Sequence, residues 1–512
     1  MRKLIPQAVA AGRMVALTLA PFAGRRVRGK PAPNRTPQSD FFAAIDAYLE
    51  RQLALLHVPG ATFAIVEGDK IVHLHSFGKA RPGGEATTAQ TPFAVGSLTK
   101  SFTALAVMQL VEAGEVELDA PVQRYLPWFR VADPQASAEI TVRHLLNQTS
   151  GLPQSAGLRP LADFDDRPGA GARQARSLST LKLTRPVGAV WEYSNMNYNL
   201  LGLIVAAVSG ESYGDYIQNH IFTPLEMTHS YTSQAQAQQN GMAVGSRYWF
   251  AIPVTAPNLR LPRGSLPSGQ LISGAEDMAH YLIAQVNEGR YGDVQLLSPA
   301  GIAELHRPAV AARAMGLSFG HYGMGWFTEV IGRTRIVSHS GTQPHFFAYM
   351  ALLPEQKKGV ILLLNANHLM MDRLVFTRVG AGVAALLAGD EPVPSRFGAA
   401  MPWALRSLLL VPVLQLAGVA ATVRMLRRWH RDPTSRPSRG AILRRHILLP
   451  LLPDVLVTLP LLGMLWSGAL NVMLLFMPDI TWLSLACGSG ALAWLVPRTG
   501  LVLRIVRKPP AA

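Results

Sequence analysis

The feature that most constrains this 512-residue chain is the apolar character of residues 403–512. Three apolar stretches lie there, at about 403–423, within 447–477 and at about 480–497. Each reaches roughly the 20 residues that a helix needs to cross the hydrocarbon core of a bilayer. We therefore predict a membrane region of about three transmembrane helices in 403–512. A Pro- and Gly-rich linker at 391–402 joins it to the preceding part of the chain.

The positive charge of the chain is concentrated beside its apolar segments. Of the 48 Lys and Arg residues, eight lie in residues 1–35 and thirteen in 401–512, so the middle of the chain holds 27 basic and 29 acidic residues. No continuous basic face remains to neutralise phosphates, which argues against a nucleic-acid partner. The Arg-rich segment after the first span and the basic tail are typical of cytoplasmic loops. Three crossings of the cell membrane would then place the middle of the chain on the extracytoplasmic side.

Residues 1–39 are predicted to be an export signal or an uncleaved anchor, followed by a linker. Arg2 and Lys3 precede an apolar stretch, 4–23, that Arg13 interrupts, and no clear small-x-small cleavage site follows. A disordered basic arm is the alternative. The single cysteine, Cys487, lies in an apolar segment, so the chain cannot form an intrachain disulfide.

Residues 40–390 are predicted to form one globular domain. Apolar periodicity favours helices at 41–56, 98–113 and 200–209. Two strands flank a Gly-Asp turn, at 61–67 and 71–77, and two more flank a Pro-Glu turn, at 346–353 and 359–365. Strands at both ends with helices between them predict an α/β fold of the α+β kind. One antiparallel sheet is closed by both ends of the domain and carries a helical insertion.

A Ser-x-x-Lys motif opens the helix predicted at 98–113. Residues i and i+3 share a helix face, so the Lys100 amine can reach the Ser97 hydroxyl. A serine hydroxyl becomes an effective nucleophile when a neighbour takes its proton, and a lysine can do so where burial lowers its pKa. The apolar residues around the motif indicate an enclosed lysine. Taken alone, the motif is equally compatible with an N-cap followed by a surface lysine.

A second motif, Tyr193-Ser194-Asn195, precedes the helix predicted at 200–209 and is expected in a loop. A phenol near two cations could titrate low enough to act as a general base or acid. The Asn195 amide could orient Lys100 and a substrate carbonyl. Taken alone, this motif is also compatible with a turn and an N-cap.

A third motif, His339-Ser340-Gly341, precedes the strand predicted at 346–353. A glycine at a strand edge lets a substrate lie close to the backbone. The N–H of the next residue, Thr342, could pair with that of Ser97 as an oxyanion hole.

Together, the three motifs resemble those of the serine β-lactamase and penicillin-binding-protein superfamily. The resemblance is closest to its class C-like branch of serine hydrolases, which includes D-aminopeptidases, D-Ala-D-Ala carboxypeptidases and esterases. It covers residues 40 to about 385. Further landmarks agree with the family in order and spacing: Ile140–Leu146 leading into Thr149–Pro153, then Phe222–Met227, Ser268–Ser273 and Tyr322–Trp326.

The resemblance implies the roles of the individual residues. It implies an acyl-enzyme on Ser97 and proton transfer shared by Lys100 and Tyr193, either of which could be the base. Substrate binding and the oxyanion hole would then involve Asn195, His339, Gly341 and Thr342.

Two positions depart from the family pattern. His339 stands where β-lactamases of this type have lysine, which disfavours β-lactamase activity and resembles the family's esterases and peptidases. Gln148 stands where many relatives have histidine, and no catalytic consequence is expected from it.

The predicted function is that of a membrane-anchored serine hydrolase that cleaves an ester, an amide or a D-amino-acid-containing peptide. A penicillin-binding or ligand-sensing membrane module with little turnover is the alternative. The expected partners are a small-molecule or peptide substrate and the lipid bilayer. The mechanism requires no cofactor, and no metal-binding pattern of the His-Glu-x-x-His type is present.

Overall fold

The computed structural model describes residues 38–256, 260–314, 317–375, 379–392, 396–449 and 469–507, with isolated positions between 450 and 468. The chain divides into two units, of which one ends at Gly398 and the other begins at Ala399. The export signal or anchor predicted in 1–39 lies almost wholly outside the described residues.

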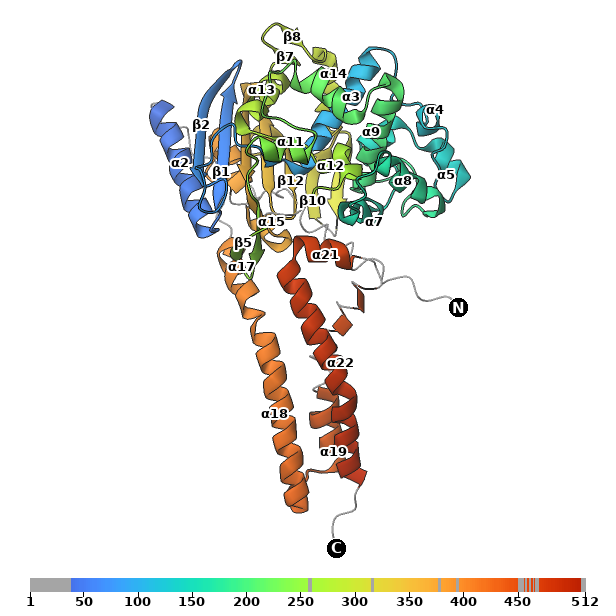
Figure 1. Cartoon of the computed structure of the whole chain (residues 1–512), viewed down its shortest axis with the longest axis vertical. Helices are drawn as coiled ribbons and strands as arrows, with labels where there is room; N and C mark the ends of the chain where they lie inside the picture. Colours follow the sequence, from blue (N-terminus) through green and yellow to red (C-terminus); the bar gives the residue numbers. More distant parts are fainter. Residues whose placement is uncertain are drawn as a thin grey trace. The chain divides into compact units, whose positions relative to one another are not determined.

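An eight-stranded antiparallel sheet organises the first unit (Figure 1). Its strand order is β2-β1-β14-β13-β12-β11-β10-β9. The first two strands join β14 through pairs that run from Ala61↔Leu364 to Glu67↔Lys358. Both ends of the domain therefore meet in one sheet, which confirms the predicted α+β fold. The strands are β1 (Gly60–Glu67), β2 (Lys70–Gly78), β9 (Val310–Ala314), β10 (Leu317–Tyr322), β11 (Phe327–Ile331), β12 (Thr334–Thr342), β13 (Phe347–Leu353) and β14 (Lys358–Leu364).

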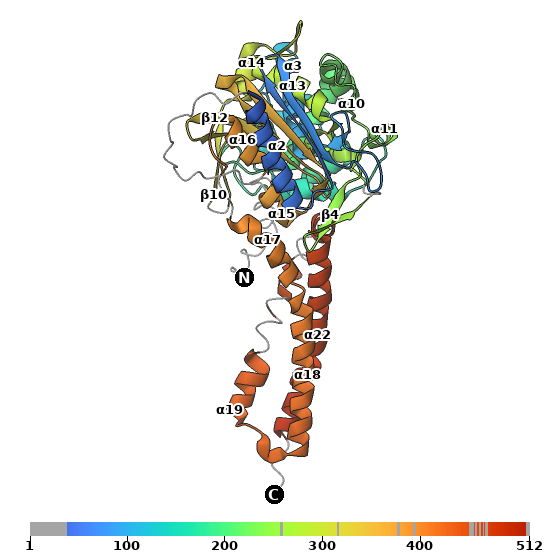
Figure 2. The same ribbon diagram turned by 90° about the vertical axis from the view of Figure 1, so that its left-hand side faces the viewer.

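Helices cover both faces of this sheet (Figure 2). Successive side chains of a strand point to opposite faces, so a strand buried along its length needs cover on both. In β1, Ala64 and Val66 belong to the core that α13 (Ala275–Val286) completes. Phe63 points to the other face and lies against His73, on which Phe42 of α2 (Gln38–Leu55) stacks. Helix α16 (Ala381–Leu387) packs against both α2 and β14.

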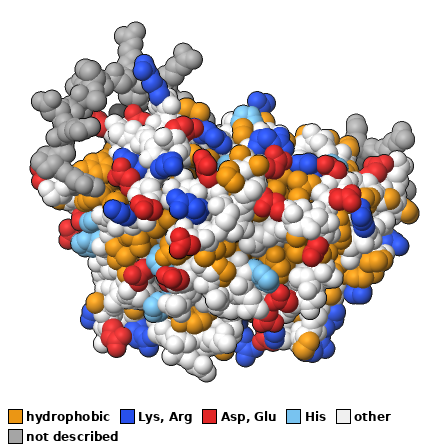
Figure 3. Space-filling view, turned by 90° about the horizontal axis from the view of Figure 1, so that it is seen from above, with side chains coloured by type: hydrophobic (Ala, Val, Ile, Leu, Met, Phe, Trp, Pro, Cys, Tyr) orange, Lys and Arg blue, Asp and Glu red, His pale blue; other side chains and the backbone are white. Residues whose placement is uncertain are grey.

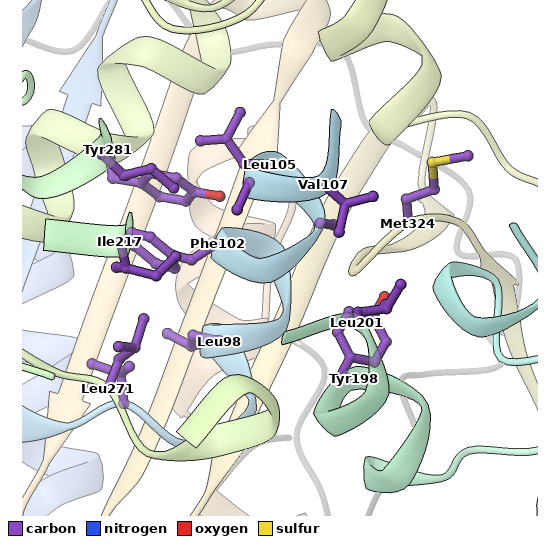
Figure 4. Close-up of a cluster of buried hydrophobic side chains, with 14 of the residues drawn as sticks. Leu98, Phe102, Leu105, Val107, Tyr198, Leu201, Ile217, Leu271, Tyr281 and Met324 are labelled. Carbon is purple, nitrogen blue, oxygen red and sulfur yellow. The ribbon is translucent and has the colours of Figure 1, made fainter. Parts of the chain in front are cut away.

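Helix α3 (Thr99–Glu112) is enclosed on all sides, and a short 3-10 turn, Gly96–Leu98, leads into it. Eleven of its fourteen residues are buried, which marks a core helix. Figure 4 shows apolar side chains of this helix and of its neighbours, among them Phe102 of α3, Leu201 and Tyr281. Four helices of the insertion pack against α3: α9 (Asn195–Ser209), α10 (Tyr213–Ile217), α12 (Leu266–Gly269) and α14 (Pro299–Leu305). The other helices described there are α4 (Val122–Tyr125), α5 (Pro134–Glu139), α6 (Val142–Leu146), α7 (Gln154–Leu158), α8 (Ala170–Arg176) and α11 (Gln234–Gln239).

Short strand pairs complete the first unit. They are β3 (Phe93–Ala94) with β6 (Ile272–Ser273), β7 (Arg290–Tyr291) with β8 (Val294–Gln295), and β4 (Ser246–Trp249) between β5 (Ile252–Thr255) and β15 (Ala366–Asn367). Helix α15 (Leu369–Val375) follows β15.

Helix α9 begins at Asn195, five residues before the predicted start at Leu200. The polar run that precedes Leu200 has low helix propensity, so periodicity alone missed it. In the folded chain its side chains find buried partners: Asn197 accepts a hydrogen bond from Ser150 Oγ at 2.6 Å, and Tyr198 Oη donates to Leu146 O at 2.8 Å. Asn195 is thus the first helical residue, while Tyr193 lies in the loop before it.

Acidic and basic side chains are interspersed on the face of the molecule seen in Figure 3. Ion pairs also join residues far apart in the sequence: Arg143 bonds to Asp119 at 2.7 Å and to Glu304 at 2.9 Å. This distribution agrees with the near balance of charge in the middle of the sequence.

The second unit contains two helical segments long and apolar enough to cross a membrane, at Ala400–Arg431 and Pro478–Arg504. The first comprises most of α17 (Arg396–Ser407) and α18 (Leu410–Arg431), and the second lies in α22 (Pro478–Arg507). Gln415 of α18 bonds to Cys487 of α22, and further along Leu426 and Trp429 cluster with Val502. The two helices therefore pack side by side in the same direction.

The prediction of three spanning helices is corrected to two within the described residues. The middle span was placed within 447–477, and most of 450–468 lies outside the described part. The helix described there, α21 (Leu470–Phe476), has seven residues, too few to cross a bilayer. Helix α19 (Arg439–Ile442) is shorter still.

Candidate active site

Ser97 lies on the turn that leads into α3, and Lys100 lies one helical turn further along. Lys100 Nζ is 2.9 Å from Ser97 Oγ, the contact that the i, i+3 spacing predicts. The lysine is completely buried, and its ammonium or amine nitrogen also donates to the Ser268 carbonyl oxygen at 2.5 Å. Thr99 Oγ1 fixes the turn by donating to Gly96 O at 2.7 Å.

Burial holds the pKa of Lys100 well below its usual value. The nitrogen lies 4.9 Å from the centre of the Tyr193 ring and 5.7 Å from that of Tyr198. In these surroundings the unprotonated amine is favoured, because removing a charge from water without an anionic partner is costly. A neutral amine can accept the Ser97 hydroxyl proton while it donates to Ser268 O.

Tyr193 completes the contact with the nucleophile from the loop before α9. Its hydroxyl donates to Ser97 Oγ at 2.9 Å. Burial raises the pKa of Tyr193 well above its usual value, and the neighbouring Tyr322 adds to the rise. The sequence predicted a lowered pKa for the Tyr193 phenol, and that prediction is wrong for this site because aromatic groups enclose the ring. A protonated Tyr193 is a proton donor, which leaves Lys100 as the group able to take the Ser97 proton.

Gln148 holds the loop that carries Tyr193. Its backbone oxygen accepts from Glu192 N at 2.8 Å, and its side-chain Oε1 accepts from Ser194 N at 2.9 Å. The two residues that flank Tyr193 are thus bonded to one buried glutamine, whose backbone has a left-handed φ of 59°. The same Oε1 accepts from Asn197 Nδ2 at 2.5 Å. Sequence reasoning assigned this position no catalytic consequence, and the structure gives it a positioning contact.

The turn at Ser97 is pressed against β12 where that strand carries Gly341 and Thr342. A Cβ added to Gly341 would overlap the Val95 carbonyl oxygen and lie 2.9 Å from its carbon. A Cβ added to Gly96, whose φ is 57°, would lie 2.7 Å from Thr342 N. Glycine at both positions brings the backbone of Thr342 next to the nucleophile, as an oxyanion hole requires.

Asp372 of α15 lies behind this strand end. Its Oδ2 accepts from Thr342 Oγ1 at 2.9 Å. Burial raises the pKa of Asp372 to about 8. Sequence reasoning gave no signal for this contact, because 30 residues separate the two side chains.

His339 is buried on β12 beside Tyr193, with ring centres 6.3 Å apart. Its Nδ1 donates to Ser340 O at 2.7 Å, and its Nε2 is buried without a hydrogen-bond partner. Burial, with a smaller effect of Lys100, lowers the pKa of His339 to about 3. The imidazole is therefore neutral at physiological pH and supplies no positive charge for a substrate carboxylate.

Asn195 does not make the hydrogen bond to Lys100 that was predicted for it. Its Nδ2 donates to Gly157 O at 3.3 Å, and its Oδ1 is buried without a partner. The hydrogen bonds described for Lys100 Nζ go to Ser97 Oγ and Ser268 O. Ser268 O therefore orients the lysine, as Asn195 was expected to do. The Ser268–Ser273 landmark lies at this contact, but the bonding atom is a backbone carbonyl oxygen, which every residue has. Nothing in the sequence therefore singled out Ser268. A contact between Asn195 and a substrate amide stays a prediction.

Known proteins are similar to this chain over the part that carries the site. The family model described as Beta-lactamase matches residues 45–385. Protein flp of Staphylococcus aureus (strain COL) is 30% identical over 338 residues, which cover 65% of this chain and 64% of that protein. Penicillin-binding protein 4 of Amycolatopsis lactamdurans is 32% identical over 321 residues, 61% of this chain and 81% of that protein. The chain thus spans just under two thirds of the flp proteins.

Solved structures show the same fold. The penicillin-binding protein homologue from Pyrococcus abyssi superposes with a TM-score of 0.59 at 27% identity, over 69% of this chain and 78% of that one. The structure of a class C β-lactamase mutant gives 0.56 at 20% identity, over 70% and 99%. The family model covers most of the chain and contains all three motifs. The chain therefore belongs to the Beta-lactamase family.

Proposed function

We propose that this protein is a serine hydrolase that forms an acyl-enzyme on Ser97. The observation that carries the proposal is the position of Ser97 Oγ, which lies 2.9 Å from both Lys100 Nζ and Tyr193 Oη. One neighbour is an amine whose burial favours its neutral form, and the other is a phenol whose burial favours its protonated form. A nucleophile between a proton acceptor and a proton donor is suited to acyl transfer.

In the proposed reaction, Ser97 Oγ attacks the substrate carbonyl carbon while its proton passes to the Lys100 amine. The N–H groups of Ser97 and Thr342 stabilise the negative charge on the carbonyl oxygen. The bond to the leaving group then breaks, and the leaving atom takes a proton from Tyr193, which regains one from the Lys100 ammonium. Water attacks the acyl-enzyme along the reverse proton path and releases the acid.

The proposed substrates are esters, amides or D-amino-acid-containing peptides that need no cation beside the reacting carbonyl. The neutral His339 stands where a cation would recognise a carboxylate, and aromatic rings of Tyr322 and Phe327 lie 6.2 and 5.3 Å from its ring. An apolar, uncharged wall favours neutral groups. Stable acylation by penicillin without turnover is the second candidate, which the similarity to a penicillin-binding protein supports.

We further propose that α18 and α22 anchor the protein in the cell membrane. Arg427, Arg428 and Arg431 lie at the end of α18, the helix that follows the hydrolase domain. Placing this basic end in the cytoplasm puts the hydrolase domain on the extracytoplasmic side. Protease added to intact cells should cut the hydrolase domain, and a domain protected until lysis would contradict this orientation.

The test of the enzymatic proposal compares the full chain in detergent with its Ser97→Ala variant. Each is incubated with benzylpenicillin, a p-nitrophenyl ester and a D-alanine amide, while intact-protein mass spectrometry and product release are followed. Ester or amide cleavage by the wild type alone supports the hydrolase, and a lasting penicillin adduct on the wild type alone supports the second candidate. Cleavage that persists in Ser97→Ala would refute both.

A further inference from the structure

Three side chains able to bind a metal ion meet at the edge of the sheet, away from the proposed active site. They are Asp46 of α2 and His73 and His75 of β2. β2 is the first strand of the sheet and stands four positions from β12, about 19 Å at the usual strand spacing. Figure 2 shows α2 lying across this part of the sheet.

The two histidines share a face because they are two residues apart in a strand. Their partners across the ladder are Ile65 for His73 and Phe63 for His75. The intervening residue, Leu74, packs against the core on the opposite face. Both imidazoles therefore point to the side where α2 presents Asp46.

The distances among the three side chains suit a single ion. His73 Nε2 is 2.8 Å from Asp46 Oδ1, His75 Nδ1 is 3.4 Å from Asp46 Oδ2, and the ligand atoms of the group lie within 4.8 Å of one another. In a tetrahedral zinc site with bonds of roughly 2.0–2.1 Å, ligand atoms are about 3.3 Å apart. The distances between the three ligand atoms would have to change by between a few tenths of an ångström and about 1.5 Å to reach that spacing.

The rings are held in place by their neighbours. His73 is stacked on Phe42 with ring centres 4.7 Å apart and an angle of 2° between the planes. His75 is stacked on Phe77 at 4.5 Å. The side chains remain 18% exposed at His73, 24% at Asp46 and 41% at His75, so an ion and a water molecule can reach them. A preorganised, accessible pair of imidazoles with one carboxylate is a ligand set that zinc takes.

We propose that Asp46, His73 and His75 bind one divalent transition-metal ion, with zinc as the favoured ion and water in the fourth position. The ion joins the first helix of the domain to the edge strand of its sheet. It therefore acts as a structural clamp rather than as part of the hydrolytic reaction. Sequence reasoning looked for helical metal motifs and so overlooked the His-x-His pair, because the third ligand lies 27 residues away from His73.

The test measures zinc binding by the full, tag-free chain in detergent after treatment with EDTA. Competition with a chromogenic zinc chelator gives the stoichiometry and affinity, and cobalt gives the intense visible absorption of a tetrahedral site. We expect one tight zinc ion per chain and a higher melting temperature on adding zinc. His75→Gln, which leaves the His73–Asp46 contact in place, and Asp46→Asn should each weaken binding by more than about tenfold.

His220→Gln is the matched control. His220 and Glu211 form a histidine–carboxylate pair at 2.6 Å with side chains 45% and 33% exposed, but among the described residues no third ligand joins them. This variant and Ser97→Ala should both bind zinc as the wild type does, which separates the metal site from the proposed hydrolase. Zinc affinity unchanged in both His75→Gln and Asp46→Asn, or equally reduced in His220→Gln, would overturn the proposal. A wild type that neither binds zinc nor gains stability would show that the cluster is a hydrogen-bonded group only.

Discussion

Replacing Gly341 by alanine tests whether the close approach of β12 to the Ser97 turn forms the oxyanion hole. The added Cβ would overlap the Val95 carbonyl oxygen and approach Ala348 Cβ to 3.2 Å. The obstructing atom belongs to the backbone and cannot rotate away, so the strand end has to retreat by on the order of 1 Å. Thr342 N moves with it. Loss of one oxyanion donor typically costs about 10²–10³ in kcat, or roughly 3–4 kcal/mol of transition-state stabilisation.

The assay is the acylation rate of Gly341→Ala with a p-nitrophenyl ester, beside a melting curve by circular dichroism. We expect kcat/KM to fall at least about 100-fold while a cooperative transition remains. Gly269→Ala is the control: its added Cβ would lie 3.7 Å from Gly96 C and from Gln343 Nε2, in ordinary contact. That variant should acylate at nearly the wild-type rate. A Gly341→Ala protein as active as the wild type would refute the inference that Thr342 N–H forms part of the oxyanion hole. If Gly341→Ala does not fold, Gly96→Ala tests the same close approach, because its added Cβ would lie 2.7 Å from Thr342 N.

Three further predictions follow from the site. Gln148→Ala leaves the Ser194 N–H without its acceptor and should lower the free energy of unfolding by roughly 2–4 kcal/mol, measured in urea, with a fall in kcat as the Tyr193 loop loosens. With the neutral Lys100 amine as the proposed base, the acylation rate should rise as pH increases through its lowered pKa, and Lys100→Arg should lose about 10²–10⁴-fold at every pH. An acylation rate that falls as pH increases through this range would contradict the assignment of Lys100 as the base. His339→Lys introduces a cation and should raise penicillin acylation relative to ester cleavage by roughly 10- to 150-fold, whereas an unchanged ratio would show that this position does not contact the carboxylate.

Much of the fold was predictable because its signals are local. The helix around Phe102 and the hairpins that flank Gly68-Asp69 and Pro354-Glu355 are set by apolar periodicity and turn residues. The pairing of Ser97 with Lys100 follows from helix geometry alone, since i and i+3 lie on one face whatever surrounds them. The order of the three motifs likewise identified the family before any contact was known.

Contacts between distant segments could not be predicted in this way. The start of α9 was missed because its polar first turn is stabilised by Ser150 and Gln148 rather than by its own propensity. The middle span was predicted on composition alone, and the one helix described within 447–477, α21, has seven residues, while most of 450–468 lies outside the described part.

The sequence by itself determined which groups we propose for the chemistry: Ser97, Lys100 and Tyr193 lie in motifs that resemble those of the family in order and spacing. Only the tertiary structure decided their protonation, because the pKa of a buried group depends on the solvent it loses and on neighbours that the chain brings from elsewhere. It likewise decided that Ser268 O, rather than Asn195, bonds to the lysine. The His73–Asp46 contact has the same origin, since a helix and a strand must pack before their side chains can meet.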